Sequence, residues 1–315
     1  MMEGTNVSSQ TWGFILLGFS DRPHLEPLLF ALVLVFYMLT LVGNLAIVLV
    51  SRLDAALHTP MYFFLGHLSV LDLCFTTSLA PQTLAHLHSA DKTITFGGCV
   101  VQLYTSLALG STECLLLAVM ALDRFVAVCQ PLHYVLVMNP RLCRRLASAS
   151  WLGGLANSLV HATFTLQLPF CGRRLDHFIC EVPALLKLAC ADTSTNELVL
   201  FTISILFVLL PPVLILVSYG FIGRAVLRTK SVEARRKAFS TCSSHLTVVV
   251  IFYGTIIYMY LQPRDNYSQD RGKFISLFYT NVTPALNPLI YTLRNKDVKG
   301  ALRKLFAGRL CSPRS

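Results

Sequence analysis

Seven long apolar runs are the feature that most restricts what this chain of 315 residues can fold into. About 20 apolar residues in a helix are long enough to cross the roughly 30 Å hydrocarbon core of a bilayer. Hydrophobic residues make up 54% of the chain and charged residues only 13%, whereas a soluble domain carries about 25% charged residues. We therefore expect an all-α membrane protein, a seven-transmembrane helix bundle, with spans near 27–51, 60–82, 97–122, 143–167, 198–223, 239–262 and 274–293.

Polar residues and prolines interrupt three of these runs. Asp72 and Glu113 lie inside the second and third runs, and an ionisable group at mid-membrane depth is costly enough to indicate a functional site. Pro211 and Pro212 are expected to break the fifth span, because proline lacks the backbone N–H and its ring clashes with the preceding turn.

The net charge of +10 is distributed unevenly along the chain. If the N-terminus lies outside, most Lys and Arg residues fall in cytoplasmic loops and after Tyr291, as the positive-inside rule requires. Because these residues occupy alternate loops and do not form one binding face, we expect no nucleic-acid partner. The N-terminus is therefore predicted to be extracellular and the C-terminus cytoplasmic.

The predicted organisation has three parts: an extracellular tail over 1–26, the seven-transmembrane domain over 27–293, and a cytoplasmic helix and tail over 294–315. The tail lacks the pattern of a cleaved signal peptide, so none is expected. Its sequon at Asn6 is a candidate for N-glycosylation.

A short amphipathic eighth helix is predicted after the last span. Val298, Ala301, Leu302 and Leu305 recur at helical spacing, with basic residues opposite them. Such a helix lies on the inner membrane surface and contacts membrane lipids. Cys311 beyond it is either a palmitoylation site or a free thiol, and both alternatives stay open.

Four of the ten cysteines are expected on the extracellular side: Cys99, Cys171, Cys180 and Cys190. Four cysteines allow three pairings, and the sequence alone leaves all of them open. Three of the four belong to the segment from about 168 to 197, the longest predicted loop. We expect this loop to be ordered and to cover the outer mouth of the bundle.

Three motifs lie near helix ends: Met120-Ala-Leu-Asp-Arg-Phe-Val-Ala-Val-Cys-Gln-Pro-Leu-His-Tyr134, Lys237-Ala-Phe-Ser-Thr-Cys-Ser-Ser-His-Leu246 and Pro284-Ala-Leu-Asn-Pro-Leu-Ile-Tyr-Thr-Leu-Arg-Asn295. Together they resemble the signature motifs of olfactory receptors, which are rhodopsin-like G-protein-coupled receptors. The resemblance covers nearly the whole chain and implies a plasma-membrane location. It also implies disulfides between Cys99 and Cys180 and between Cys171 and Cys190.

For Asp72 and Glu113 the resemblance implies an allosteric sodium site that stabilises the resting state, and no other cofactor is expected. Two facing carboxylates must share a proton or bind a cation. The alternative is that each carboxyl is protonated and hydrogen-bonded to neighbours such as Ser69, Asn44 or Asn287.

The resemblance further implies a switch for a heterotrimeric G protein at the cytoplasmic end. Its residues are expected to be Asp123, Arg124, Tyr219, Asn287, Pro288 and Tyr291. In this switch Arg124 leaves Asp123, and Tyr291 rearranges with Tyr219 toward it, opening a crevice. Leu122 and Phe125 stand where the family usually has tyrosines, which is expected to alter basal activity or coupling strength without abolishing coupling.

Alignment with the family places a ligand cavity in mid-bundle, lined by Ser106, Leu107, Gly110, Ser111, Ile203, Ser204, Phe207, Tyr253, Ile256, Ile257 and Tyr260. This mostly apolar lining suits a small hydrophobic volatile molecule, although small residues also serve helix packing. The outer halves of the last three spans show no basic residue, so a carboxylate ligand is not favoured. Ser106 stands where aminergic receptors have an aspartate, and Asn281 where opsins have the retinal lysine, which argues against an amine and excludes retinal.

The predicted function is therefore an odorant receptor that activates a stimulatory, olfactory-type G protein and raises cyclic AMP. The same receptor type could instead sense a metabolite outside the olfactory epithelium. A third hypothesis is a cation or proton transporter that uses Asp72 and Glu113. The sequence shows no inverted repeat of the kind from which many transporters are built, which argues against this hypothesis. Motifs of common enzyme classes, such as a P-loop or a Gly-x-Ser-x-Gly elbow, are missing from the sequence, so no enzyme activity is expected.

Overall fold

A computed structural model describes residues 13–229, 231–260, 269–294 and 296–307. The predicted sites Asn6 and Cys311 lie outside these described residues, as does the side chain of Tyr260.

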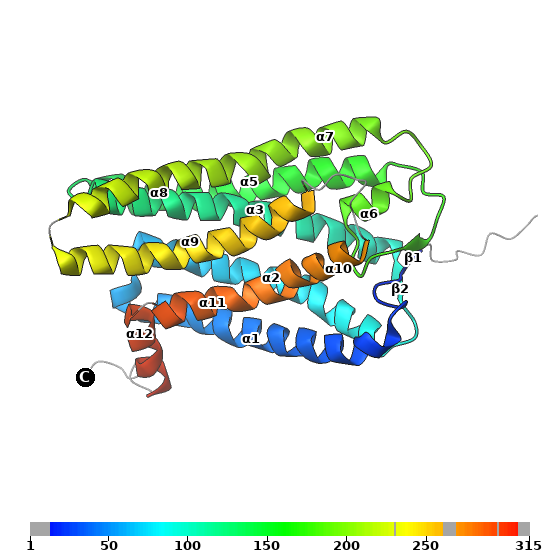
Figure 1. Ribbon diagram of the computed structural model, residues 1–315, viewed down its shortest axis with the longest axis horizontal. Coiled ribbons are helices and arrows are strands. Elements are labelled where there is room, and N and C mark those ends of the chain that lie inside the picture. Colours follow the sequence, from blue (N-terminus) through cyan, green and yellow to red (C-terminus); the bar gives the residue numbers. More distant parts are fainter. Residues whose placement is uncertain (1–12, 230, 261–268, 295, 308–315) are drawn as a thin grey trace, which may run out of the picture.

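Long helices run side by side between the two ends of the molecule (Figure 1). Five of them are α1 (Glu26–Leu53), α2 (Pro60–His88), α3 (Phe96–Cys129), α5 (Pro140–Leu166) and α9 (Val232–Tyr260). Two further long helical segments contain a π-helical turn: α7 (Ser194–Ser204) continues through Ile205–Leu209 into α8 (Leu210–Arg228), and α10 (Gln269–Leu277) continues through Phe278–Val282 into α11 (Thr283–Arg294). Short helices are α4 (Tyr134–Val137), α6 (Val182–Leu186) and α12 (Lys296–Phe306), with 3-10 turns at Pro23–Leu25 and Ala55–Leu57.

Each predicted apolar run coincides with one of these long segments. Every segment begins at or before the predicted run, and most also end after it. The backbone stays helical where the side chains are polar, as at Glu233 before one run and at Asp123 after another. By length and composition, three described helices are able to cross a membrane: Pro23–Leu53, Pro60–His88 and Ser194–Arg228. Their outward faces are apolar, with Val42 64% and Leu216 64% exposed, as expected where a helix meets lipid.

The prediction that Pro211 and Pro212 break the fifth span is wrong. The helix continues through this region, because the π-helical turn Ile205–Leu209 lies immediately before the prolines. The prolines occupy the first positions of α8, where backbone N–H groups have no partner one turn back within their own helix.

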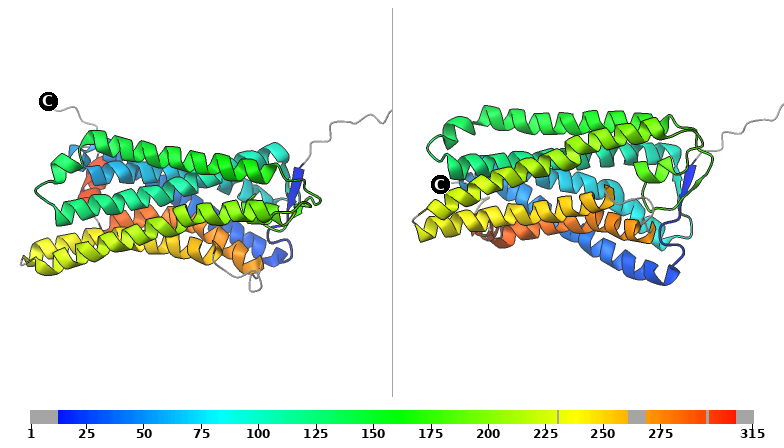
Figure 2. Two further views of the ribbon diagram at one scale, coloured as in Figure 1. Left: turned by 90° about the horizontal axis from the view of Figure 1, so that it is seen from above. Right: turned by 45° about the horizontal axis from the view of Figure 1, so that its top comes forward.

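A small sheet, which the sequence did not predict, closes one end of the bundle. Its strands are β1 (Gly13–Leu16), β2 (Thr93–Thr95) and β3 (Arg174–Leu175), in the order β2-β1-β3. β1 pairs antiparallel with β2, with Phe14 opposite Ile94, and parallel with β3, with Ile15 opposite Arg174. We call this end the sheet end and the opposite one the α12 end; Figure 2 shows both from two further directions.

Two disulfides order the long loop at the sheet end. Cys99, in the first turn of α3, is bonded to Cys180, and Cys171 is bonded to Cys190, with Cα separations of 5.5 and 5.6 Å. Of the three pairings that the sequence left open, these are the ones implied by the resemblance. Phe170 and Ala189 form a β-bridge beside the second disulfide.

Close contact between α3 and α5 depends on Gly154. A Cβ atom on this glycine would meet the Thr112 hydroxyl and lie 2.5 Å from the Ala108 carbonyl oxygen and 2.9 Å from the Thr112 nitrogen. Backbone atoms cannot yield as a flexible side chain can, so any residue larger than glycine forces the two helices apart.

Gly154→Ala is therefore expected to lower the melting temperature of the purified protein in detergent, since overpacking costs about 1–3 kcal/mol. Gly220 is the matched control, because a Cβ there meets nothing within 4 Å. Gly220→Ala is expected to leave the melting temperature unchanged or to raise it, since alanine favours helices over glycine. Equal effects of the two substitutions would contradict the close-contact argument.

The C-terminal helix α12 is turned away from the axes of the long helices (Figure 1). Val298 and Ala301 on its apolar side are each only 1% exposed. Lys304 donates a hydrogen bond to the Asp54 carboxylate at 3.0 Å, which links α12 to the connection between α1 and α2.

The Lys304 hydrogen bond lowers the pKa of Asp54 below its ordinary value of 3.8. Because the folded protein favours the carboxylate, the stabilisation is fully present above that value and is lost as the pH falls through the lowered pKa. Asp54→Asn is expected to reduce the free energy of unfolding at pH 7 by up to about 1 kcal/mol, since Lys304 is partly exposed. Melting curves at decreasing pH should show this difference beginning to shrink near pH 3.8 and disappearing below the lowered pKa; a constant difference would exclude the ion pair.

Candidate functional site

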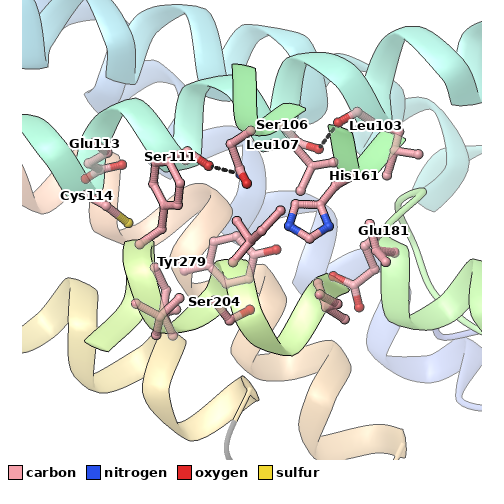
Figure 3. A pocket seen from close by; sticks show the side chains of 18 of the residues that line it. Leu103, Ser106, Leu107, Ser111, Glu113, Cys114, His161, Glu181, Ser204 and Tyr279 are labelled. Carbon is pink, nitrogen blue, oxygen red and sulfur yellow. Dashed lines mark hydrogen bonds between the residues drawn. The ribbon is translucent and has the colours of Figure 1, made fainter. Parts of the chain in front are cut away.

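A pocket of about 110 Å³ lies among the long helices in the half of the bundle nearer the sheet end. Its described lining includes Ser106, Leu107, Gly110 and Ser111 from α3, Ile203, Ser204 and Phe207 from α7 and the following π-helical turn, and Ile256 from α9. All of these were predicted from the sequence to surround the ligand cavity. Figure 3 shows the side chains around this pocket.

Two predicted ligand residues do not line the pocket. Tyr253 is 2% exposed, and its hydroxyl donates a hydrogen bond to the Cys114 carbonyl at 2.8 Å. Ile257 packs against the hydrophobic core of the bundle. In this arrangement, Tyr253 ties α9 to α3 directly beside the pocket.

Several lining residues were missed because the alignment with the family placed pocket residues only on the segments that form α3, α7 with its π-helical turn, and α9. Asn157 and His161 come from α5, Tyr279 from the π-helical turn after α10, and Glu181 from the loop just before α6. A signal for Glu181 was present in the sequence. Glu181 directly follows Cys180, and the Cys99–Cys180 disulfide holds Cys180 against the first turn of α3.

The polar side chains of α3 and α5 that line the pocket are partly hydrogen-bonded to each other. Asn157 Nδ2 donates to Ser111 Oγ at 2.5 Å, while Asn157 Oδ1 has no hydrogen-bond partner among the described residues. The Ser106 hydroxyl donates to the carbonyl oxygen of Leu103 at 3.1 Å. The Asn157 oxygen is therefore free to accept a hydrogen bond from a ligand.

The prediction that no basic residue lies in the outer part of the last span is wrong. Helix α10 begins at Gln269 and carries Lys273, which is only 2% exposed and has its Nζ atom 2.5 Å from Asp176 Oδ1. The predicted span began one residue too late to include it. Lys273 does not line the pocket, because it pairs with the loop that covers the sheet end.

Asp72 and Glu113 are buried, at 0% and 4% exposure. Asn287 Nδ2 donates to Asp72 Oδ2 at 3.0 Å. Asp72 Oδ1 and Glu113 Oε1 have no hydrogen-bond partner in the part of the chain that the structure describes. Asn44 does not serve Asp72 as a donor, since its amide nitrogen donates to the carbonyls of Thr40 and Pro284.

The oxygens of Asp72 and Glu113 fit a hard cation, which takes oxygen ligands. Each carboxyl keeps one buried oxygen free for such a contact. No group of three or more His, Cys, Asp and Glu side chains able to hold a metal occurs among the described residues. Any sodium ion here would therefore need hydroxyl, amide, carbonyl or water oxygens to complete its shell.

At the α12 end of α3, Arg124 is paired with Asp123. Arg124 Nε donates to Asp123 Oδ2 at 2.9 Å, and the Tyr134 hydroxyl donates to Asp123 Oδ1 at 2.8 Å. Asp123 is fully buried, so both of its oxygens are satisfied by these two neighbours. This role of Tyr134 was not predicted from the sequence, although Tyr134 ends the motif that begins at Met120.

Tyr219 on α8 is hydrogen-bonded to α9. Its hydroxyl forms a hydrogen bond with His245 Nδ1 at 2.8 Å, and the two rings are stacked. Tyr291 is 2% exposed, and its hydroxyl has no partner among the residues described. Pro288 is inside α11, near the middle of that helix. In this structure Arg124 is paired with Asp123, and Tyr219 is hydrogen-bonded to His245.

A family model described as olfactory receptor matches residues 32–309 of the chain. The chain belongs to the olfactory receptor family. It is 73% identical to human olfactory receptor 2G3 over 98% of this chain and 100% of that relative. It is 62% identical to human olfactory receptor 2G6 and 64% identical to mouse olfactory receptor 2C1, with at least 95% of each chain covered.

Olfactory receptors are multi-pass membrane proteins of the G-protein-coupled receptor class, and they are receptors and not enzymes. The resemblance that the three motifs indicated is confirmed. The mid-bundle pocket and the Asp123–Arg124 pair are thus features of an olfactory receptor, one near each end of α3.

Proposed function

We propose that this olfactory receptor binds a small, mostly hydrophobic odorant in the mid-bundle pocket and activates a stimulatory, olfactory-type G protein, which raises cyclic AMP. Seven helical segments span the plasma membrane: α1, α2, α3, α5, α7–α8, α9 and α10–α11. The sheet end is extracellular, and the α12 end meets the G protein.

Charge and length support this topology. Basic residues gather beyond Tyr291 and where α8 ends and α9 begins, at the α12 end, which the positive-inside rule assigns to the cytoplasm. Helix α12 places basic residues opposite a buried apolar side, as in helices that lie on a membrane surface.

The observation that carries the ligand proposal is the pocket itself. Its volume of about 110 Å³ is well below the roughly 300–1,000 Å³ of sites for drug-sized ligands. Leu103, Leu107, Phe207 and Ile256 supply apolar walls. A molecule of few atoms that gains most of its affinity from apolar burial suits this space.

Activation is a population shift between two arrangements of the bundle. The ligand contacts α3 and α9 at the pocket, and the same helices carry Arg124 and His245 at the α12 end. In the active arrangement Arg124 leaves Asp123, Tyr219 and Tyr291 move toward it, and α9 swings outward below Gly254, a rigid-body helix shift. A ligand drives this change only by binding the active arrangement more tightly than the resting one.

The test is to express the chain in cells with the olfactory-type G protein and to apply a chemically diverse odorant panel. Cyclic AMP is recorded together with surface staining. A dose-dependent response supports the proposal. Surface-expressed receptor that stays silent across the panel, with and without other G-protein classes, overturns it.

The sodium proposal for Asp72 and Glu113 gives a separate prediction. A cation that stabilises the resting arrangement lowers agonist sensitivity, so replacing external sodium with an inert cation is expected to lower the half-maximal agonist concentration. Asp72→Asn removes the charge and should abolish this sodium dependence. Sodium dependence that persists in Asp72→Asn would favour the hydrogen-bonding alternative, in which Asn287 satisfies the carboxyl.

A further inference from the structure

The described pocket lining carries carboxyl groups but no cationic Lys or Arg side chain. Its described lining contains two carboxyl groups, Glu113 and Glu181, and the free Oδ1 atom of Asn157. No Lys or Arg belongs to the described lining. A ligand that brings a donor into this space would therefore find acceptors, whereas an anionic ligand would meet repulsion.

The two carboxyl groups lie at different depths. Glu113 follows Leu103 by ten positions on α3, which is about 15 Å along a helix, and it is near Asp72. Glu181 lies at the sheet end with His161, opposite Glu113 and Cys114 in the close view (Figure 3). Only the Glu181 end is separate from the proposed sodium site.

Glu181 is held in place through its neighbour. Cys180 is bonded to Cys99, and its backbone N–H donates to Gln102 Oε1 at 2.7 Å. These bonds hold the chain at Glu181 close to the first turns of α3, and the residue is only 8% exposed. A carboxyl in a fixed and largely dry position is suited to selecting a ligand group by hydrogen bonding.

Both polar side chains at this end keep free capacity. His177 Nε2 lies 3.2 Å from Glu181 Oε1, and no described residue donates to Glu181 Oε2. The His161 ring is 5% exposed and forms no hydrogen bond with any residue in the described part of the chain. Buried polar groups normally find a partner, and here the pocket is the place for one.

We propose that Glu181 and His161 together bind the polar end of the ligand, and that this end is a hydrogen-bond donor on a short apolar chain, either a hydroxyl or a protonated amine. The inference rests on the proposed odorant function and adds the ligand class. The apolar chain points toward Phe207 and Ile256. Ser106 donates its hydroxyl hydrogen to Leu103 and is neutral, so it does not offer an ammonium group the negative charge that Glu181 offers.

The test compares molecules of equal chain length in cells expressing the full chain: 1-hexanol, hexylamine, methyl pentyl ether and hexanoic acid. Homologues of roughly four to eight carbons are included to cover the pocket size. The alcohol, the amine or both are expected to act at about 10- to 100-fold lower concentration than the ether. The acid is expected to be inactive. The two donor arms distinguish a hydroxyl from an ammonium group.

Variants then locate the selectivity. Glu181→Leu and His161→Phe are each expected to raise the effective concentration of the preferred donor toward that of the ether, leaving the ether unchanged. Glu181→Gln should weaken the amine more than the alcohol, since an amide oxygen still accepts a hydrogen bond but carries no charge. Asp192→Asn is the control, because this exposed carboxyl in the same loop bonds to Ser194 and not to the pocket.

An ether as potent as the alcohol and the amine overturns the proposal, as does a donor preference that survives Glu181→Leu. If that variant fails to reach the surface, the Glu181→Gln and His161→Phe responses and the ligand comparison in the unmodified chain decide. Responses to esters or acids alone would overturn this inference and leave the odorant function standing. Silence toward every compound in the panel would overturn the odorant function itself.

Discussion

Arg124→Ala is expected to reduce the odorant-stimulated cyclic AMP response to the level of cells without the receptor. Arg124 is the basic group at the α12 end of α3, and it is held by the fully buried Asp123. In the proposed mechanism this guanidinium leaves Asp123 to contact the G protein, and alanine has no group able to do so. The measurement is cyclic AMP against ligand concentration, with surface staining and ligand binding on the same cells.

Arg141→Ala is the matched control, because Arg141 is an exposed arginine at the start of α5. It removes the same side chain from the same end of the molecule and should leave the response intact. Ligand binding by Arg124→Ala is expected to persist, since the pocket lies in the other half of the bundle. Normal signalling by Arg124→Ala at equal surface level would contradict the assigned role.

Cys99→Ala is expected to abolish surface expression almost completely. The Cys99–Cys180 disulfide closes a loop between residues 81 positions apart, and removing a native disulfide typically costs about 2–5 kcal/mol. It also releases Glu181 and the loop that covers the sheet end. Cys180→Ala and the double variant should behave like Cys99→Ala, because all three lose the same bond.

Surface staining relative to total receptor measures this effect. Cys74→Ala is the control, since Cys74 is a free and exposed cysteine on α2. Cys171→Ala is expected to be milder, because its disulfide closes a separation of only 19 positions. A normal surface level for Cys99→Ala would show that packing alone holds the loop.

The long helices were predictable because their apolar runs are far longer than a buried soluble helix requires. Their ends were not, because polar residues such as Asp123 and Glu233 continue the helices past the apolar region. At Pro211 the predicted break failed because a π-helical turn upstream accommodates the prolines. The strands were not predicted because they are too short to show a period of two. Their paired residues, such as Ile15 and Arg174, are also distant in sequence.

The predicted pocket residues on α3, α7 and the following π-helical turn came from alignment with the family, and the structure gathers them around one cavity. His161 and Glu181 were missed because the alignment supplied no pocket residue from α5 or from the long loop. Their position depends on where the Cys99–Cys180 bond draws the loop, which is a long-range contact. Lys273 was missed for a similar reason. Its buried charge is neutralised by an ion pair with Asp176, a residue nearly a hundred positions earlier in the chain.

The position of β1 has a consequence for biosynthesis. Ile15 leaves the ribosome long before its strand partner Arg174, which lies beyond four long helices in the chain. Until the segment after α5 has been translated and has folded back onto β1, that strand has only β2 beside it. The completed sheet therefore forms late, and an antibody specific for it would separate finished receptors from chains still held in the secretory pathway.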